Sequence, residues 1–206
     1  MNSTPENEKD ITGSQTPQTN QSMNEEVILG DFNRIPDGIP AEGDVFIRLK
    51  PIDMISYWKR CSMLSDFVAA FYANPREQSQ VLENSISTIF NELIENAIKC
   101  SIKRDGEVKI HVKLYDSILR IDIENITTSN HYDSFQKHAK KLIECEDLES
   151  LYYQTLAEKS DNASEGSGIG LLLLMKDYPI KFGVKFTNVN GVKSANIQVY
   201  YSLEDA

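Results

Sequence analysis

The sequence predicts an α/β fold, a two-layer sandwich of helices on one face of a mixed, mostly antiparallel sheet. Two observations carry this prediction. Segments with the two-residue period of a strand come in close pairs around short polar turns, and longer stretches with helical spacing separate them. A third observation supports one substantial core, because 40% of the 206 residues are apolar and the length fits one domain with residues to spare.

The first 26 residues differ in composition from the rest of the chain. Their apolar side chains are Met1, Ile11 and Met23, and they carry five acids and one lysine. A segment that buries so little cannot offset the entropy lost on ordering. We therefore expect residues 1–26 to form a disordered acidic tail and residues 27–206 to form a single domain.

The first half of this domain is predicted to contain one strand and two helices. The strand covers Asp44 to Leu49, after a turn rich in Pro and Gly. Helical spacing of apolar residues predicts helices from Ile52 to Ala73 and from about Arg76 to Ile102. On the first helix the aromatic residues are expected to form core or a dimer face, which leaves a homodimer open: Trp58, Phe67, Phe71 and Tyr72.

The second half is predicted to hold two hairpins separated by helices. Strands at Val108 to Leu114 and Ile118 to Ile126 flank a turn at Asp116-Ser117. A polar, helical insertion from Thr127 to Ser164 and a helix after Gly170 follow. The chain then closes with strands at Ile180 to Val189 and Ala195 to Ser202, around the turn at Asn190-Gly191.

Charge and cysteine content exclude several classes of function. The 21 basic and 31 acidic residues leave a net charge of −10, which disfavours nucleic acid as the main ligand. No apolar run has the length of a membrane span, so a membrane partner is not expected. The three cysteines form neither a disulfide framework nor a zinc motif, and a reducing cytoplasm fits them best.

The second predicted helix carries three polar residues beside its apolar stripe. At 100° per residue, Glu92, Asn96 and Lys99 share one face at the border of the stripe. A carboxylate can deprotonate a nucleophile, an amide oxygen is a hard ligand suited to magnesium, and an ammonium group can meet a phosphate. The same three residues also fit an ordinary solvated helix face, and both interpretations stay open here.

A glycine-rich segment precedes the third long helix. It comprises Gly166, Ser167, Gly168, Ile169, Gly170 and Leu171. Alternate glycines before a helix leave backbone N–H groups free to approach an anion. The segment has neither the Lys of a Walker A loop nor the preceding strand of a dinucleotide-binding unit. It is therefore a candidate phosphate loop, with a hinge or helix-entry turn as the alternative.

Together these two motifs resemble the boxes of the GHKL, or Bergerat-fold, ATPase superfamily. The stretch from Glu92 to Ala97 is similar to the E-x-x-x-N-A box, and the stretch from Gly166 to Leu171 is similar to the G-x-G-hydrophobic-G-L box. The resemblance covers roughly residues 76–202 and implies a site for ATP with Mg²⁺ on Asn96. It implies that Glu92 is the general base or orients it, and that the triphosphate lies at the glycines.

One motif of this superfamily is altered. The family usually has a D-x-G-x-G motif whose Asp receives the adenine amino group. Asn125 stands at the matching strand end here, and Ala195 replaces a Thr that usually lies near the adenine. An amide oxygen accepts a hydrogen bond, but less strongly than a carboxylate. The alternative interpretation of Asn125 is a plain strand-end turn residue.

The single-domain organisation is most similar to the anti-sigma-factor type of serine/threonine kinase used in bacterial partner switching, and to a divergent SiaB-like group within it. The resemblance implies phosphorylation of a Ser or Thr on a small antagonist protein. Residues 127–164 would form the ATP lid with a hinge at 164–168, and would be the segment for partner contact, with a solvated surface loop as the alternative. A second hypothesis is a GHKL-derived binding module that sequesters a regulatory partner and has little or no catalytic activity.

Overall fold

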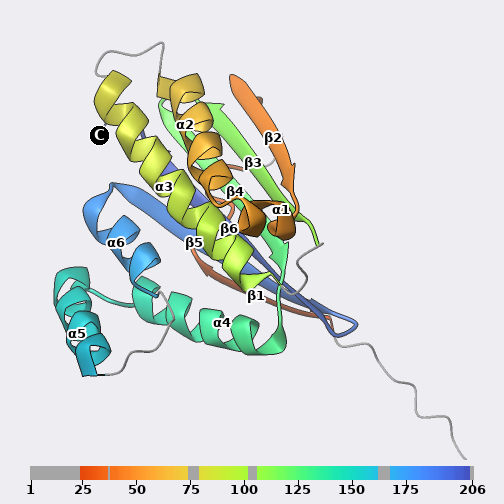
Figure 1. The fold of residues 1–206 in the computed structure, drawn as a ribbon, viewed down its shortest axis with the longest axis vertical. Coiled ribbons are helices and arrows are strands. Elements are labelled where there is room, and N and C mark those ends of the chain that lie inside the picture. The colour runs from red at the N-terminus through yellow and green to blue at the C-terminus, as the bar shows by residue number, and fades with distance from the viewer. Residues whose placement is uncertain (1–23, 37, 74–78, 102–105, 162–167, 205–206) are drawn as a thin grey trace, which may run out of the picture.

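The computed structural model describes residues 24–36, 38–73, 79–101, 106–161 and 168–204. In chain order the elements are β1 (Glu25–Gly30), β2 (Gly43–Leu49), α1 (Pro51–Ser56), α2 (Lys59–Ala73), α3 (Ser79–Cys100), β3 (Val108–Tyr115), β4 (Ile118–Ile126), α4 (Ser129–Ile143), α5 (Leu148–Asp161), α6 (Ile169–Asp177), β5 (Ile180–Val189) and β6 (Val192–Ser202) (Figure 1). The α/β class is confirmed. Both ends predicted for the second helix, Arg76 and Ile102, lie outside the described residues.

The strands form one sheet in the order β1-β5-β6-β4-β3-β2, and each neighbouring pair is antiparallel. The mixed sheet that we expected is therefore not found among the described strands. Tight turns reverse the chain within two pairs, at Asp116 with a φ of 54° and at Asn190-Gly191 with φ of 52° and 81°. Positive φ at such positions matches the right-handed twist of hairpin strands, and both turns were predicted.

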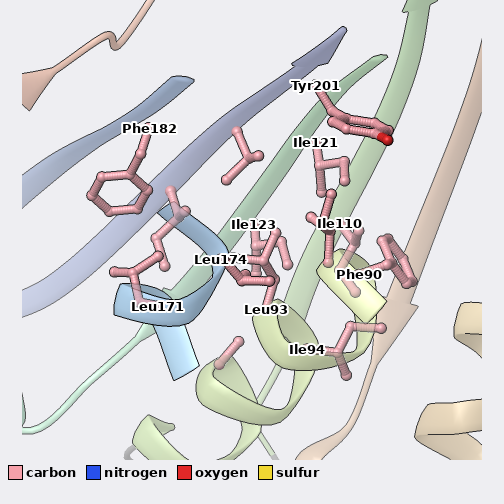
Figure 2. Packing of buried hydrophobic residues seen from close by; sticks show 14 of the residues in the cluster. Phe90, Leu93, Ile94, Ile110, Ile121, Ile123, Leu171, Leu174, Phe182 and Tyr201 are labelled. Carbon is pink, nitrogen blue, oxygen red and sulfur yellow. The ribbon is translucent and has the colours of Figure 1, made fainter. Parts of the chain in front are cut away.

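The core lies between α3 and one face of the sheet. Figure 2 shows Phe90, Leu93 and Ile94 of α3 packed near Ile110, Ile121 and Ile123 of the central strands. The apolar stripe predicted on this helix is confirmed, because its members are at most 3% exposed: Leu82, Ile86, Ile89, Phe90, Leu93 and Ala97. Ile94 and Ile98 are buried as well, so α3 is covered on more than one side.

The single helix predicted from Ile52 to Ala73 is wrong in one respect, since the chain forms α1 and α2 with a break between them. Pro51 starts α1, and Tyr57 ends it with φ −141° and ψ 72°, its N–H bonded to Met54 O. Arg60 N then bonds to Tyr57 O at 2.8 Å as α2 begins. The two residues between the helices, Tyr57 and Trp58, break the helix without disturbing the apolar spacing, so periodicity did not reveal the break.

The aromatic residues of these two helices divide between core and surface. Tyr72 is 2% exposed and donates its hydroxyl to Val112 O at 2.8 Å, which confirms a core position. Trp58, Phe67 and Phe71 are 38%, 55% and 51% exposed, so the expectation of core is wrong for them. The buried side of α2 consists largely of small side chains, namely Cys61, Ser65, Ala69 and Ala73. The dimer face remains a hypothesis.

The insertion after β4 is helical, as predicted, and forms α4 and α5. The hydroxyl of Thr128 caps α4 by accepting from His131 N at 3.2 Å. Tyr132 and Phe135 place their rings 5.3 and 5.4 Å from that of Phe186 on β5, in edge-to-face geometry. Helix α4 is thus packed against the sheet, whereas α5 contacts α6.

One strand was not predicted. β1 pairs with β5 and includes Glu25 and Glu26, which composition had assigned to the tail. The chain that follows β1 crosses the face of the sheet that points away from the core. On that face Asn33 N donates to Gln198 Oε1 at 2.7 Å, and Arg34 N donates to Tyr200 OH at 2.9 Å. None of the described helices is both long and apolar enough to cross a bilayer.

Candidate functional site

The two sequence motifs meet where α3 passes the first turn of α6. The carboxylate of Glu92 lies so close to Gly170 that a Cβ added there would overlap Glu92 Oε2. The same Cβ would stand 3.8 Å from Asn96 Nδ2. Only glycine fits at this position without displacing the carboxylate. The structure therefore brings Gly170 next to Glu92 and Asn96, from which it is far apart in the sequence.

Glu92 lies in an environment that disfavours its charged form. Burial raises the pKa of its carboxyl group, and the neighbouring Glu95 raises it further, while Lys99 acts in the opposite direction. A carboxylate whose pKa is raised is a stronger proton acceptor once it is ionised. Glu92 thus combines a raised pKa with a position beside the glycine segment.

A cavity of about 730 Å³ opens beside these residues. Its walls come from α3, the end of β4, α4, the start of α6 and β6. The residues that line it are Asn96, Ala97, Lys99, Cys100, Asn125, Thr127, His131, Ser134, Phe135, His138, Gly168, Leu171, Ala195 and Ile197. The volume is in the range of sites that hold a small organic ligand.

Asn125 lies at one end of this cavity, beside Ala195, its partner in the β4–β6 register. It is 4% exposed, and its Nδ2 donates to Ala97 O at 3.4 Å. A carbonyl oxygen only accepts, so this bond turns the amide nitrogen toward α3 and leaves Oδ1 as the acceptor. The oxygen of Asn125 is therefore available to a ligand that donates an N–H.

Lys99 reaches the cavity but is also engaged elsewhere. Its Nζ lies 3.0 Å from Glu95 Oε2 and 5.5 Å from the ring centroid of Trp58. The ion pair is exposed, and exposed pairs of this kind contribute about 0–1 kcal/mol, so a bound anion can compete for the ammonium group.

The glycine segment is described in part. Gly166 and Ser167 lie outside the described residues. Gly168 is the N-cap residue of α6, and Ile169, Gly170 and Leu171 form its first turn. Leu171 is 6% exposed and belongs to the core as well as to the cavity wall. Gly168 and Leu171 thus place the first turn of α6, whose N–H groups have no partner within the helix, at the wall of the cavity.

The sequence did not lead us to predict that α4 lines the cavity. His131, Ser134, Phe135 and His138 all line the cavity. Their spacing of i, i+3, i+4 and i+7 was a usable signal, because it marks one face of a helix. Which face would turn toward the site depended on how the insertion packs on β5, which the sequence does not reveal.

In the part of the chain that the structure describes, no cluster of three or more His, Cys, Asp or Glu residues could hold a metal ion by itself. No known family model matches this chain, and no curated protein is significantly similar to it in sequence.

Proposed function

We propose that this protein is an ATP-binding serine/threonine protein kinase of the GHKL type, acting in the cytoplasm in a bacterial partner-switching system. The observation that carries the proposal is the contact of Gly170 with Glu92 and Asn96, next to the cavity that Asn96 lines. A base, a metal-binding amide and a glycine-started helix are the parts that phosphoryl transfer needs in one place. The partner would be a small antagonist protein that carries the accepting hydroxyl group.

The fold supports a Bergerat-type, two-layer arrangement. Helices α3 and α6, which carry the two motifs, contact each other and the same sheet. Helix α3 contacts β4, and α6 contacts β5. The insertion that holds α4 stands between β4 and α6 in the chain, where the resemblance implies an ATP lid. In this proposal α4 is the fixed part of the lid, since Tyr132, Ala139 and Leu142 are buried.

The residues present fit a magnesium ion. Mg²⁺ is commonly bound through one or two protein oxygens together with phosphate oxygens and waters, rather than by an all-protein cage. Asn96 lines the cavity next to Glu92 and offers one amide oxygen. Bound there, Mg²⁺ would neutralise negative charge on the phosphate oxygens.

The chemistry assigned to the protein follows from these positions. The hydroxyl oxygen of the partner bonds to the γ-phosphorus of ATP, the bond to the β-phosphate oxygen breaks, and ADP leaves. Glu92 takes the hydroxyl proton. The N–H groups at the start of α6 and the ammonium of Lys99 offset charge on the transferring group. Asn125 accepts from the adenine amino group.

A transfer experiment tests this proposal. Radiolabelled γ-phosphate from ATP is expected to move to a serine or threonine of a co-purified partner, rather than to water. Glu92→Gln is expected to lower the transfer rate about 10²–10⁴-fold while nucleotide still binds, because it removes the base and little volume. Since the pKa of Glu92 is raised, the rate is expected to fall with decreasing pH from a point above the ordinary range of a glutamate. Phosphate release to water at an equal or greater rate would contradict the kinase.

A second candidate function is a binding module that sequesters its partner without turning over ATP. Two observations favour it: Asn125 and Ala195 replace the usual adenine-binding residues, and Lys99 already pairs with Glu95. This candidate predicts a stable complex with the partner that Glu92→Gln leaves unchanged, and no transfer of label.

A further inference from the structure

Helix α4 extends along the cavity from one end to the other. It starts directly after β4, and His131 in its first turn lies near the strand end that carries Asn125. Seven residues later, His138 packs against Gly168, where an added Cβ would stand 2.9 Å from His138 Cε1 and 3.2 Å from Nε2. Seven helical residues span about 10 Å. This length is comparable to the reach of a nucleotide from its base to its phosphates.

The charge of the cavity wall favours an anion at the Gly168 end. The chain has ten more acids than bases, yet the described residues that line the cavity include no carboxylate. Their ionisable nitrogen groups are those of Lys99, His131 and His138. The first turn of α6 adds the positive end of its helix dipole beside His138. The half-buried imidazole of His138 thus lies beside the positive end of α6, in a wall whose described residues carry no carboxylate.

From this placement we infer that His138 binds the phosphates of the nucleotide, as a second contact beside the α6 amides. This inference rests on the proposed ATP site and adds a residue that neither motif contains. The imidazole donates an N–H to a phosphate oxygen, and a protonated ring would donate from both nitrogens. Because His138 belongs to α4, phosphate binding would also tie the insertion to the start of α6.

Two ligands distinguish phosphate binding by His138 from a purely structural role of His138 in the cavity wall. ATP with Mg²⁺ carries the phosphates, and adenosine carries only the base and ribose. Calorimetric titration of the full chain with each ligand would compare wild type with His138→Ala and His138→Gln. The ligand that binds more weakly is measured by its competition with the other ligand. Lys137→Ala is the matched control, because Lys137 is the exposed neighbour on α4 and does not line the cavity. The melting temperature of each variant without ligand reports its folding.

His138→Ala is expected to weaken ATP binding about tenfold or more, as for the loss of a hydrogen bond to a charged group, and to change adenosine binding less than about twofold. His138→Gln keeps a donor and is expected to recover part of the affinity for ATP. Lys137→Ala is expected to change neither by more than about twofold. Equal losses for ATP and adenosine, or no loss, would overturn the role of His138 and leave the ATP site standing. Wild-type protein that binds neither ligand would overturn this inference and the proposed function together.

Discussion

Helices α2 and α3 pack against each other, yet they differ in which of their apolar residues are buried. On α3 the large residues Phe90, Leu93 and Ile94 are at most 1% exposed. On α2 the large residues Met63, Phe67 and Phe71 are between 51% and 62% exposed, while small residues such as Ala69 are fully buried. Both helices show helical spacing of apolar residues in the sequence, so spacing alone did not distinguish them.

The difference follows from position. Helices α2 and α3 lie side by side over the sheet, and α3 also contacts α1, α6 and β4, so it is covered from several sides (Figure 1). Helix α2 contacts α3 through a stripe of small residues, which allows a close approach of the two backbones. Met63, Phe67 and Phe71 lie on its outer side, although Val68 and Tyr72 are buried together with the small residues. At the edge of the helical layer, a face of mainly small residues is therefore buried while large apolar residues on another face stay exposed.

The largest effect is expected from shortening a side chain on the second buried face of α3. Ile94→Ala should lower the free energy of unfolding by about 2–5 kcal/mol, because it leaves a cavity in a fully covered site. Chemical denaturation measures this change, with Leu93→Ala on the confirmed stripe as the reference. A loss for Ile94→Ala below about 1 kcal/mol would mean that α3 is covered on one face only.

Enlarging a small residue on α2 tests the other half of the comparison. Ala69→Leu is expected to destabilise the protein by about 1–3 kcal/mol, because the added atoms have no space between α2 and α3. The melting temperature would report it. If Ala69→Leu left stability unchanged, the contact between these helices would be looser than the structure indicates.

Gly170→Ala is expected to cost less, no more than about 1 kcal/mol, because the new methyl group overlaps only the end of the flexible Glu92 side chain and alanine favours the helix more than glycine does. The contact is tested most sharply by a double-mutant cycle with Glu92→Ala. In that background Gly170→Ala should cost less, since the overlapping atoms are gone. Strictly additive costs would show that the two residues do not touch.

A smaller effect, with a defined pH dependence, is expected for Glu92→Gln. The raised pKa of Glu92 means that the folded state disfavours its charged form. At a pH below its pKa in the unfolded state, Glu92 therefore does not lower the free energy of unfolding, and at a pH above its pKa in the folded state it lowers this free energy by the full amount. Glu92→Gln should therefore have the melting temperature of wild type near pH 4 and a higher one at pH 7. A difference that does not grow with pH would contradict the direction of the shift.

The smallest effect is expected on the exposed side of α2. Phe67→Ser should change the free energy of unfolding of the monomer by no more than about 0.5 kcal/mol, because the side chain is 55% exposed. Denaturation combined with sedimentation measures both stability and association. A concentration-dependent loss of stability with Phe67→Ser would instead indicate that this face is buried between two copies of the chain.

Local patterns were sufficient to predict much of the fold. The hairpin turns, the stripe on α3 and the helical insertion each depend on residues close in sequence. The strand β1 was missed because Glu25 and Glu26 resemble the tail in composition, and only pairing with distant β5 orders them. The break at Tyr57 was missed because it leaves the apolar spacing intact.

For the candidate site, the motifs predicted the reactive and ligand-binding residues, but they did not predict all of the residues that surround them. The closeness of Glu92 and Gly170 could be expected from the two motifs taken together. The i,i+4 pair of Lys99 with Glu95 is local to α3, whereas the contact of Lys99 with Trp58 depends on where the α1–α2 break places the indole ring. His138 depends on the packing of α4 against Phe186, a contact between segments that share no local pattern.

The most direct test of the account is the thermal stability of the protein with ATP, with and without Mg²⁺, in wild type and in Asn96→Ala. At 100 times the dissociation constant, binding should add about 2.7 kcal/mol, which for a chain of this length raises the melting temperature by about 5 °C or more. We predict a rise that needs Mg²⁺ in wild type and is absent in Asn96→Ala. No rise with millimolar nucleotide under either condition would contradict the ATP site.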